Sequence, residues 1–185
     1  MRGAEAVLRR STLLGRPVVV KERIKKTYRI SELDIRLRKE RTRAEARLLH
    51  KAKLAGVDCP IVLEVEEFAI TMSLIEGGHP LMDESKAQAS GRMLASLHSA
   101  DIIHGDFTPV NLMESEGRLF VIDFGLGFIS NDIEDKAIDV FTMLRALGPG
   151  KVKNAFLEGY STRNPKHGTV LKRVGEVEKR VRYAQ

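Results

Sequence analysis

Hydrophobic and polar residues follow one another along the chain in patterns that predict secondary structure. A β-branched run at residues 17–23 and a second apolar run at 67–75 each predict a strand. Between them, apolar residues recur at helical spacing from about residue 31 to 55, which predicts one long helix. Residues 113–122 predict two short strands joined by a Glu-Gly turn. The order of these elements favours an α+β fold, with strands and a long helix in the first part of the chain.

The long predicted helix carries signals at both ends. Ser31 and Asp34 have the spacing of a capping box, and Gly56 predicts where the helix stops. Apolar residues on one side form a stripe made of Leu33, Leu37, Ala44, Leu48 and Ala55. Glu45 borders one edge of this stripe and Glu40 the other, so either carboxylate could turn toward the interior.

Two segments in the middle of the chain carry its most specific chemistry. Residues 104–111 have the pattern H-x-D-x-x-x-x-N, and residues 123–125 are D-F-G. The predicted hairpin lies between them and would return Asp123 close to Asn111. Phosphoryl transfer needs a carboxylate that orients the attacking hydroxyl and oxygen ligands that hold Mg²⁺. The pattern therefore predicts Asp106 as the catalytic aspartate and Asn111 and Asp123 as Mg²⁺ ligands, although such residues taken singly also cap loops.

A strand lysine upstream completes the set that protein kinases use. Lys21 follows the run of three valines, as the lysine of the kinase V-A-I-K strand does. It would reach the α- and β-phosphates of ATP, held in place by a glutamate from the long helix. Glu45 is the first candidate for this glutamate and Glu40 the second. Taken alone, Lys21 would equally fit an exposed position at the end of a strand.

The remaining nucleotide contacts are predicted by position only. The strand at 67–75 would be the hinge that binds the adenine edge, with Met72 as gatekeeper and Ser73 and Ile75 offering a carbonyl and an N–H. Any buried strand that ends in glycines has the same pattern. No G-x-G-x-x-G precedes the strand at 17–23, and Gly3 is the glycine taken for the flap. The flap over the phosphates should therefore be short, with Gly3 in it.

Other departures from common kinase sequences concern the catalytic loop and the segment after D-F-G. Gly105 occupies the position of the usual catalytic-loop arginine, so no clamp for an activation-loop phosphate is expected. A helix with Asp135 and Asp139 begins soon after D-F-G, which leaves a small second lobe. Asp139 is expected to brace the catalytic loop from below.

Composition limits the class of protein. The chain has 185 residues, 43% of them hydrophobic, which suits one domain or two small lobes. The single cysteine, Cys59, excludes an internal disulfide and is expected to be a buried packing residue. No run is long and apolar enough for a signal peptide or a membrane span. These features predict a soluble, cytoplasmic protein with no membrane contact.

Positive charge is concentrated in one segment. Residues 21–53 contain 13 Lys or Arg against 5 Asp or Glu, a net of +8, whereas the whole chain has a net of +6. Such a basic segment is typical of a nucleic-acid partner, but a solvated helix face would fit equally well. A second basic cluster at residues 172–182 ends the chain and is expected to continue a polar helix into a mobile tail.

Taken together, these motifs resemble one known family. Besides the catalytic motifs, the likeness is carried by the residues Gly3-Ala4-Glu5-Ala6, Lys21-x-Arg23, Lys26-x-Tyr28-Arg29, Leu33-Asp34, Glu45-Ala46-Arg47, Ile75-Glu76-Gly77 and Glu134-Asp135-Lys136-Ala137. They resemble the PRPK-type family, the small atypical kinase subunit of the KEOPS complex, over nearly the whole chain. The resemblance implies a reduced bilobal protein-kinase fold that binds Mg-ATP. Its β-rich N-lobe with one long helix would span residues 1–76, and its short, mainly helical C-lobe with a basic C-terminal tail would span 77–185.

The resemblance also implies function and partners. The family members are atypical Ser/Thr protein kinases or ATPases that support threonylcarbamoyl-adenosine modification of tRNA. The C-lobe would contact the threonylcarbamoyl transferase subunit, the N-lobe a small regulatory subunit, and tRNA would bind within the complex. The isolated chain is expected to be a monomer. Two alternatives stay open, namely a kinase-fold scaffold without catalysis and a small-molecule phosphotransferase.

Overall fold

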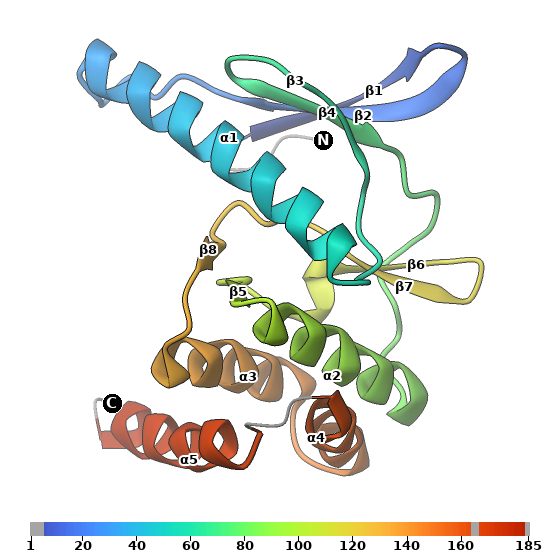
Figure 1. The fold of residues 1–185 in the computed structure, drawn as a ribbon, viewed down its shortest axis with the longest axis vertical. Helices are drawn as coiled ribbons and strands as arrows, with labels where there is room; N and C mark the ends of the chain where they lie inside the picture. The colour runs from blue at the N-terminus through green and yellow to red at the C-terminus, as the bar shows by residue number, and fades with distance from the viewer. Residues whose placement is uncertain (1–5, 164–166, 184–185) are drawn as a thin grey trace.

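The computed structural model describes residues 6–163 and 167–183, which form two lobes (Figure 1). The N-lobe is a four-stranded antiparallel sheet in the order β1-β2-β4-β3, together with one helix that contacts β3 and β4. This helix runs from the side of the sheet toward the second lobe, where it contacts β5. The bounds are β1 (Ala6–Leu13), β2 (Arg16–Arg23), α1 (Ser31–Leu54), β3 (Val62–Val65) and β4 (Ala69–Ser73).

The C-lobe is mainly helical and confirms the predicted fold class. Helix α2 packs against α4, and α3 packs against α5, below two small two-stranded sheets, β5-β8 and β6-β7 (Figure 1). The bounds are α2 (Glu84–Ser99), β5 (Ile102–Ile103), the 3₁₀ turn η1 (Pro109–Asn111), β6 (Leu112–Ser115), β7 (Arg118–Val121), β8 (Phe128–Ile129), α3 (Ile133–Leu147), α4 (Lys151–Arg163) and α5 (His167–Tyr183).

The predicted hairpin at 113–122 is present as β6 and β7. Glu116 and Gly117 have φ values of 51° and 73°. Two successive residues with positive φ are typical of a tight two-residue hairpin turn, whose twist matches that of the strands. The hairpin closes with a bond of 2.9 Å from the Ile122 amide to the Asn111 carbonyl. This bond fixes Asn111 next to the residue that precedes Asp123.

Helix α1 begins and ends where the sequence predicts, but the predicted capping box is wrong. The N-cap residue is Ile30, and no side chain caps the helix. Asp34 instead turns inward, where it accepts a hydrogen bond from the Lys26 amide and pairs with Arg38 at 2.7 Å. The Asp34 carboxylate therefore connects the first turn of α1 to the loop that precedes the helix. The C-terminal stop at Gly56 is as predicted, with φ of 76°.

The predicted apolar stripe of α1 is only partly correct. Leu48 is buried, whereas Leu33 and Ala44 are exposed. The buried side of the helix consists of Asp34, Thr42, Glu45, Ala46, Leu48, Leu49 and Ala52. Three of these seven residues are polar, so a hydrophobic pattern alone could not locate this face.

The C-terminal basic cluster lies on a packed helix, so the predicted mobile tail is wrong over the described residues. Val170, Val174 and Val177 of α5 are buried at helical spacing, and α5 packs on α3. Arg180 and Arg173 both pair with Glu134 at the start of α3. Part of the basic charge is therefore neutralised within the C-lobe.

The hydrophobic core runs from the underside of the N-lobe into the C-lobe. Ile70 and Met72 of β4 belong to the same buried cluster as Leu97 of α2 and Val140 of α3. Cys59 is buried in it, as predicted, and burial raises the pKa of its thiol to about 11. Among the helices of the described residues, none has the length and apolar character that crossing a membrane requires.

Candidate active site

Most of the predicted site residues line one cavity of about 450 Å³ between the lobes, whereas Asp106 is not among its lining residues. Lys21 enters it from β2, Glu45 from α1, and Asn111 and Asp123 from the two ends of the β6-β7 hairpin. Apolar side chains complete the wall, namely Leu8, Val19, Leu49, Met113 and Ile122. A cleft with an apolar wall and a few charged groups at one end suits a nucleotide, whose base is flat and whose phosphates are charged.

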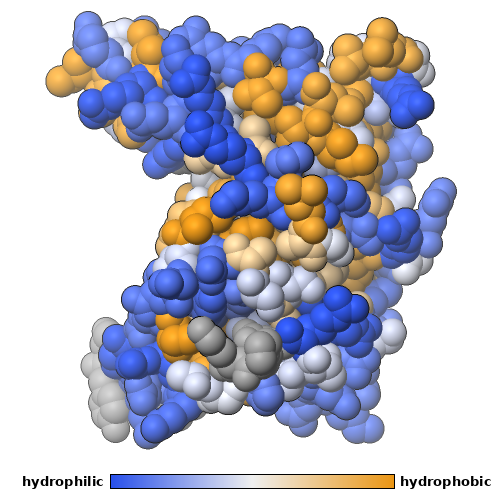
Figure 2. All heavy atoms as spheres, viewed as in Figure 1, coloured by the Kyte–Doolittle hydropathy of each residue, from blue (hydrophilic) through white to orange (hydrophobic). Residues whose placement is uncertain are grey.

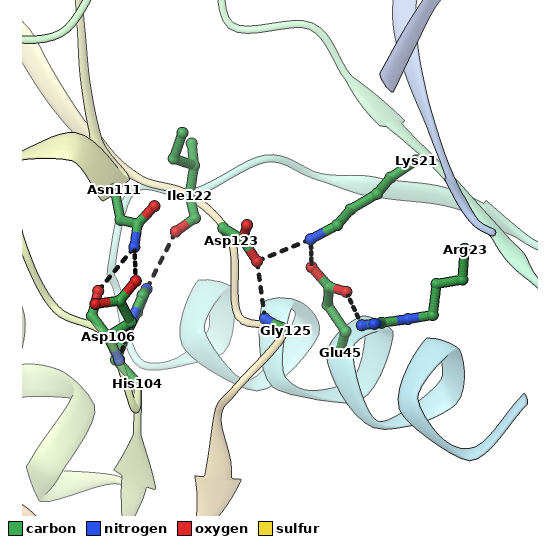
Figure 3. A network of polar contacts seen from close by, with 9 residues as sticks. All are labelled: Lys21, Arg23, Glu45, His104, Asp106, Asn111, Ile122, Asp123 and Gly125. Carbon is green, nitrogen blue, oxygen red and sulfur yellow. Dashed lines mark hydrogen bonds and ion pairs between the residues drawn. The ribbon is translucent and has the colours of Figure 1, made fainter. Parts of the chain in front are cut away.

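A chain of ion pairs crosses this cleft (Figure 3). Lys21 Nζ lies 2.6 Å from Glu45 Oε1 and 2.8 Å from Asp123 Oδ1. Of the two glutamates considered from the sequence, Glu45 is the one in contact, with only 2% of its side chain exposed, whereas Glu40 is exposed to solvent. The three side chains come from β2, α1 and the loop after β7, so their meeting depends on the whole fold.

Asp123 is held in an unusual backbone conformation. Its φ is 60°, a value that non-glycine residues seldom adopt, and its Oδ1 also accepts the Gly125 amide at 3.0 Å. Burial raises the pKa of the Asp123 carboxyl, but the charge of Lys21 and these hydrogen bonds outweigh it, so the pKa lies below its ordinary value. Asp123 is therefore ionised at neutral pH, with Oδ2 turned away from these donors (Figure 3).

The catalytic-loop residues are linked to one another. Asn111 Nδ2 donates to both the carbonyl and Oδ2 of Asp106, each at 2.8 Å. His104 Nδ1 accepts the Asp106 amide at 3.3 Å, and Nε2 lies 3.1 Å from the Ile122 carbonyl. Burial lowers the pKa of His104, so the ring is neutral and can accept at Nδ1 while it donates at Nε2. His104 thus joins the Asp106 loop to the strand that leads to Asp123 (Figure 3).

Asp139 braces this loop from α3, as the sequence predicts. Its two carboxylate oxygens accept the amides of His104 at 2.7 Å and Gly105 at 2.9 Å. His98 of α2 lies 3.3 Å from the same carboxylate and 2.8 Å from the hydroxyl of Tyr160. The sequence analysis did not identify His98 or Tyr160, because nothing in the sequence relates residues so far apart.

The predicted hinge residues line the same cavity, but their adenine contacts stay a prediction. Met72, Ser73 and Ile75 all line the cavity, and Met72 is buried. The Ser73 amide already donates to the Ile61 carbonyl at 2.9 Å, and the Ser73 hydroxyl accepts the Ile61 amide. Gly3, the predicted flap residue, lies outside the described residues.

The donor set at the end of the cleft fits Mg²⁺. Because Asn111 Nδ2 faces Asp106, its Oδ1 points away from that residue, and Asp123 turns its second carboxylate oxygen away from Lys21 and Gly125 (Figure 3). Mg²⁺ in phosphate sites is commonly held by one or two such oxygens together with the phosphates and water. Asn111 and Asp123 can therefore supply the protein ligands.

Arg23 is the functional candidate that the sequence analysis missed. Its guanidinium lies 2.6 Å from Glu45 Oε2, and only 4% of the side chain is exposed. Strand spacing could have identified Arg23 from the sequence, because residues two apart on a strand point to the same face. Lys21 and Arg23 therefore both face α1.

The chain has clear relatives. Residues 19–128 match the RIO domain family. A "Probable serine/threonine-protein kinase BUD32 homolog" of Archaeoglobus fulgidus is 43% identical over 91% of this chain and 89% of its own length. A "Probable bifunctional tRNA threonylcarbamoyladenosine biosynthesis protein" of Methanosarcina acetivorans is 40% identical over 92% of the chain, which spans only 32% of that relative.

Solved structures show the same fold. The Rio2 kinase of Chaetomium thermophilum, in a complex with ADP, Mg²⁺ and phosphoaspartate, superposes with a TM-score of 0.66 at 15% identity. The match covers 100% of this chain and 70% of the Rio2 chain. At this identity the likeness shows the fold alone, whereas the sequence matches show the family. The chain belongs to the RIO-domain family and, within it, to the BUD32-type serine/threonine-protein kinases.

Proposed function

We propose that this chain is the Mg-ATP-dependent kinase or ATPase subunit of a KEOPS-type complex that supports threonylcarbamoyl-adenosine modification of tRNA. The observation that carries the proposal is the chain of contacts from Glu45 through Lys21 to Asp123, at 2.6 and 2.8 Å, beside the Asp106–Asn111 pair. A fold alone does not fix function, but the proposal is supported by these contacts, which bring together residue types that phosphoryl transfer requires.

Each side chain has one proposed role. Lys21, oriented by Glu45, binds the α- and β-phosphates of ATP. Asp106, held at Oδ2 by Asn111, orients the attacking hydroxyl, which belongs either to a protein side chain or to water. Asn111 and Asp123 hold Mg²⁺, which when bound neutralises charge on the transferring phosphoryl group. Met72, Ser73 and Ile75 border the adenine end of the cleft.

The partners rest on the relatives. In the bifunctional proteins, a region like this chain makes up about a third of a longer polypeptide named for tRNA threonylcarbamoyladenosine biosynthesis. Covalent linkage of this kind supports a physical partnership between the kinase and the rest of that machinery. We assign the transferase subunit to the C-lobe, 77–185, and a small regulatory subunit to the N-lobe, 1–76. The same tRNA-linked names support a cytoplasmic location, with the isolated chain a monomer.

A tRNA contact is assigned to the outer face of α1. Four side chains of this face, Arg36, Arg43, Arg47 and Lys51, are exposed and form no ion pair within the part of the chain that the structure describes. Hydrophilic side chains cover much of the path of α1 (Figure 2). Unpaired cations on one helix face suit a phosphate backbone better than the α5 cluster does, because Arg173 and Arg180 are already paired.

ATP turnover tests the proposal directly. It is measured for the chain alone, with the purified transferase subunit, and with tRNA added, each with and without Mg²⁺. Turnover is expected to need Mg²⁺ and to rise with the transferase subunit. A chain that shows no turnover in any of these conditions would instead be a scaffold.

A further inference from the structure

Glu45 holds two cations rather than one. Its Oε1 lies 2.6 Å from Lys21 and its Oε2 lies 2.6 Å from Arg23. The side chain of Glu45 is 2% exposed, that of Lys21 11% and that of Arg23 4%. Both contacts are charge-assisted hydrogen bonds in a site that is largely closed to water, where such bonds are strong. The two cations differ in what else they can do.

Lys21 interacts with more than Glu45 in the cleft. It already contacts Asp123 at 2.8 Å, at the end of the cleft where the phosphates of ATP would lie. When Lys21 also binds a phosphate, Glu45 shares that cation with a second anion. Arg23 Nη2 lies on the opposite side of the Glu45 carboxylate and keeps its contact (Figure 3).

Arg23 also lies against the D-F-G segment. A Cβ atom added to Gly125 would come within 3.5 Å of Arg23 Nη2 and 3.6 Å of Lys21 Nζ. One guanidinium thus contacts α1 through Glu45 and approaches the backbone that carries Asp123. It therefore connects β2, α1 and the metal-binding segment.

We propose that Arg23 is a positioning residue, which fixes the Glu45 carboxylate so that Lys21 is correctly oriented during phosphoryl transfer. This inference rests on the proposed function of the cleft. A positioned group acts mainly on the step in which charge moves, so its loss should lower kcat more than nucleotide affinity. A merely structural arginine would change stability and leave kcat per folded molecule as it was.

The test compares Arg23→Gln and Arg23→Lys in wild-type and Glu45→Gln backgrounds. We expect Arg23→Gln to lower kcat for ATP turnover about tenfold, while the Kd for Mg-ATP changes less than about threefold. In the Glu45→Gln background it should cause no further loss of kcat, because the two residues act as one unit. Arg23→Lys, which keeps a cation of shorter reach, should recover part of the rate.

Arg38→Gln is the matched control. Arg38 is also a largely buried arginine, but it pairs with Asp34 at 2.7 Å and stacks 3.9 Å from the centre of the Phe68 ring. It reaches Arg23 only at the main-chain carbonyl, at 3.5 Å, and does not line the cleft. Its loss should lower Tm with kcat within about twofold of the parent. If Arg23→Gln behaves like this control, or if its effect multiplies with that of Glu45→Gln, the inference is wrong.

Two further measurements keep the outcome decisive. If Arg23→Gln does not fold, Arg23→Lys replaces it, and a kcat equal to the parent would then overturn the inference. Mg-ATP binding by the parent protein is measured first. Absence of binding would contradict the proposed function, whereas normal binding and turnover with an unaffected Arg23 variant would contradict this inference alone.

Discussion

At the scale of single residues, Asp123 combines a strained backbone with a defined charge. Its positive φ and its contacts with Lys21 and Gly125 fix where its carboxylate lies. Such a conformation costs about 1–3 kcal/mol and persists only where the surrounding structure holds it, commonly at functional sites. Half of the side chain remains exposed, so the carboxylate faces the cleft rather than the core.

Replacement of Asp123 by alanine should therefore remove activity without unfolding the protein. We expect Asp123→Ala to lower Mg-ATP turnover more than tenfold, a loss above about 1.4 kcal/mol in the transition state, because the proposed Mg²⁺ ligand is missing. Circular dichroism and Tm should stay close to the parent. Asp106→Ala should lose turnover as well but keep Mg-ATP binding, since Asp106 is assigned to the hydroxyl and not to the metal. Turnover by Asp123→Ala above a tenth of the parent rate would refute the metal assignment.

The sequence predicted these residues because their spacing is local. Asp106 and Asn111 lie on one loop, and a two-residue turn returns the chain to Asp123, so short-range pattern and turn chemistry suffice. Arg23 could not be found in this way. Its partner Glu45 is 22 residues further along the chain, and the contact depends on how α1 is rotated against the sheet.

At the scale of elements, α1 shows why that rotation was hard to predict. The sequence located both of its ends, but its buried face contains Asp34, Thr42 and Glu45. Burial of the two carboxylates is possible because each has partners. Asp34 bonds to the Lys26 amide and to Arg38, and Glu45 pairs with Lys21 and Arg23. Tertiary ion pairs therefore override the apolar periodicity, which is why Leu33 and Ala44 face solvent.

The prediction at this scale concerns the exposed face of α1 and its proposed contact with tRNA. If it meets tRNA phosphates, Arg43→Ala with Arg47→Ala should weaken binding and reduce the slope of log K against log salt by about 1.5 to 2 units, since each neutralised phosphate releases counterions. Mg-ATP binding should not change, because both side chains are exposed and neither lines the cleft. The measurement is tRNA binding at several salt concentrations, by the chain and by its complex with the transferase subunit.

The pair Arg173→Ala with Arg180→Ala is the control for this experiment. It removes the same charge, but from residues paired with Glu134 on the C-lobe. A slope that falls equally in both double variants would show a general charge effect. A slope unchanged by the α1 variant would assign Arg43 and Arg47 to a protein contact or to solvent.

At the scale of the whole molecule, two buried histidines connect the site to global stability. His98 and His104 lie in the C-lobe core, and burial lowers the pKa of both. His98 links α2 to Asp139 of α3 and Tyr160 of α4, while His104 links the catalytic loop to the strand before Asp123. The two-lobed fold was predictable from element order and motif spacing, but these links between distant helices were not, because they depend on packing alone.

Acid should therefore destabilise the fold from a higher pH than carboxylate titration would cause. An unfolded histidine takes up a proton below about pH 6.5, whereas His98 and His104 stay neutral in the folded state until the pH falls to their lowered pKa values. The stabilisation is thus complete above pH 6.5 and is lost as pH decreases. Within that window, each pH unit removes up to about 1.4 kcal/mol per histidine.

Thermal unfolding between pH 7.5 and 5, in a range where carboxylates change little, measures this loss. We expect Tm of the parent to fall steadily below pH 6.5. His98→Gln, which has no titrating ring and can still hydrogen-bond to Tyr160 or Asp139, should have a lower Tm at pH 7.5 and a flatter decline below pH 6.5. His50→Gln is the matched control, because His50 is exposed on α1 and its replacement should leave the curve unchanged. A parent Tm that is constant from pH 7.5 to 5 would mean that the buried histidines accept protons as readily in the folded chain as in the unfolded one, which their burial argues against.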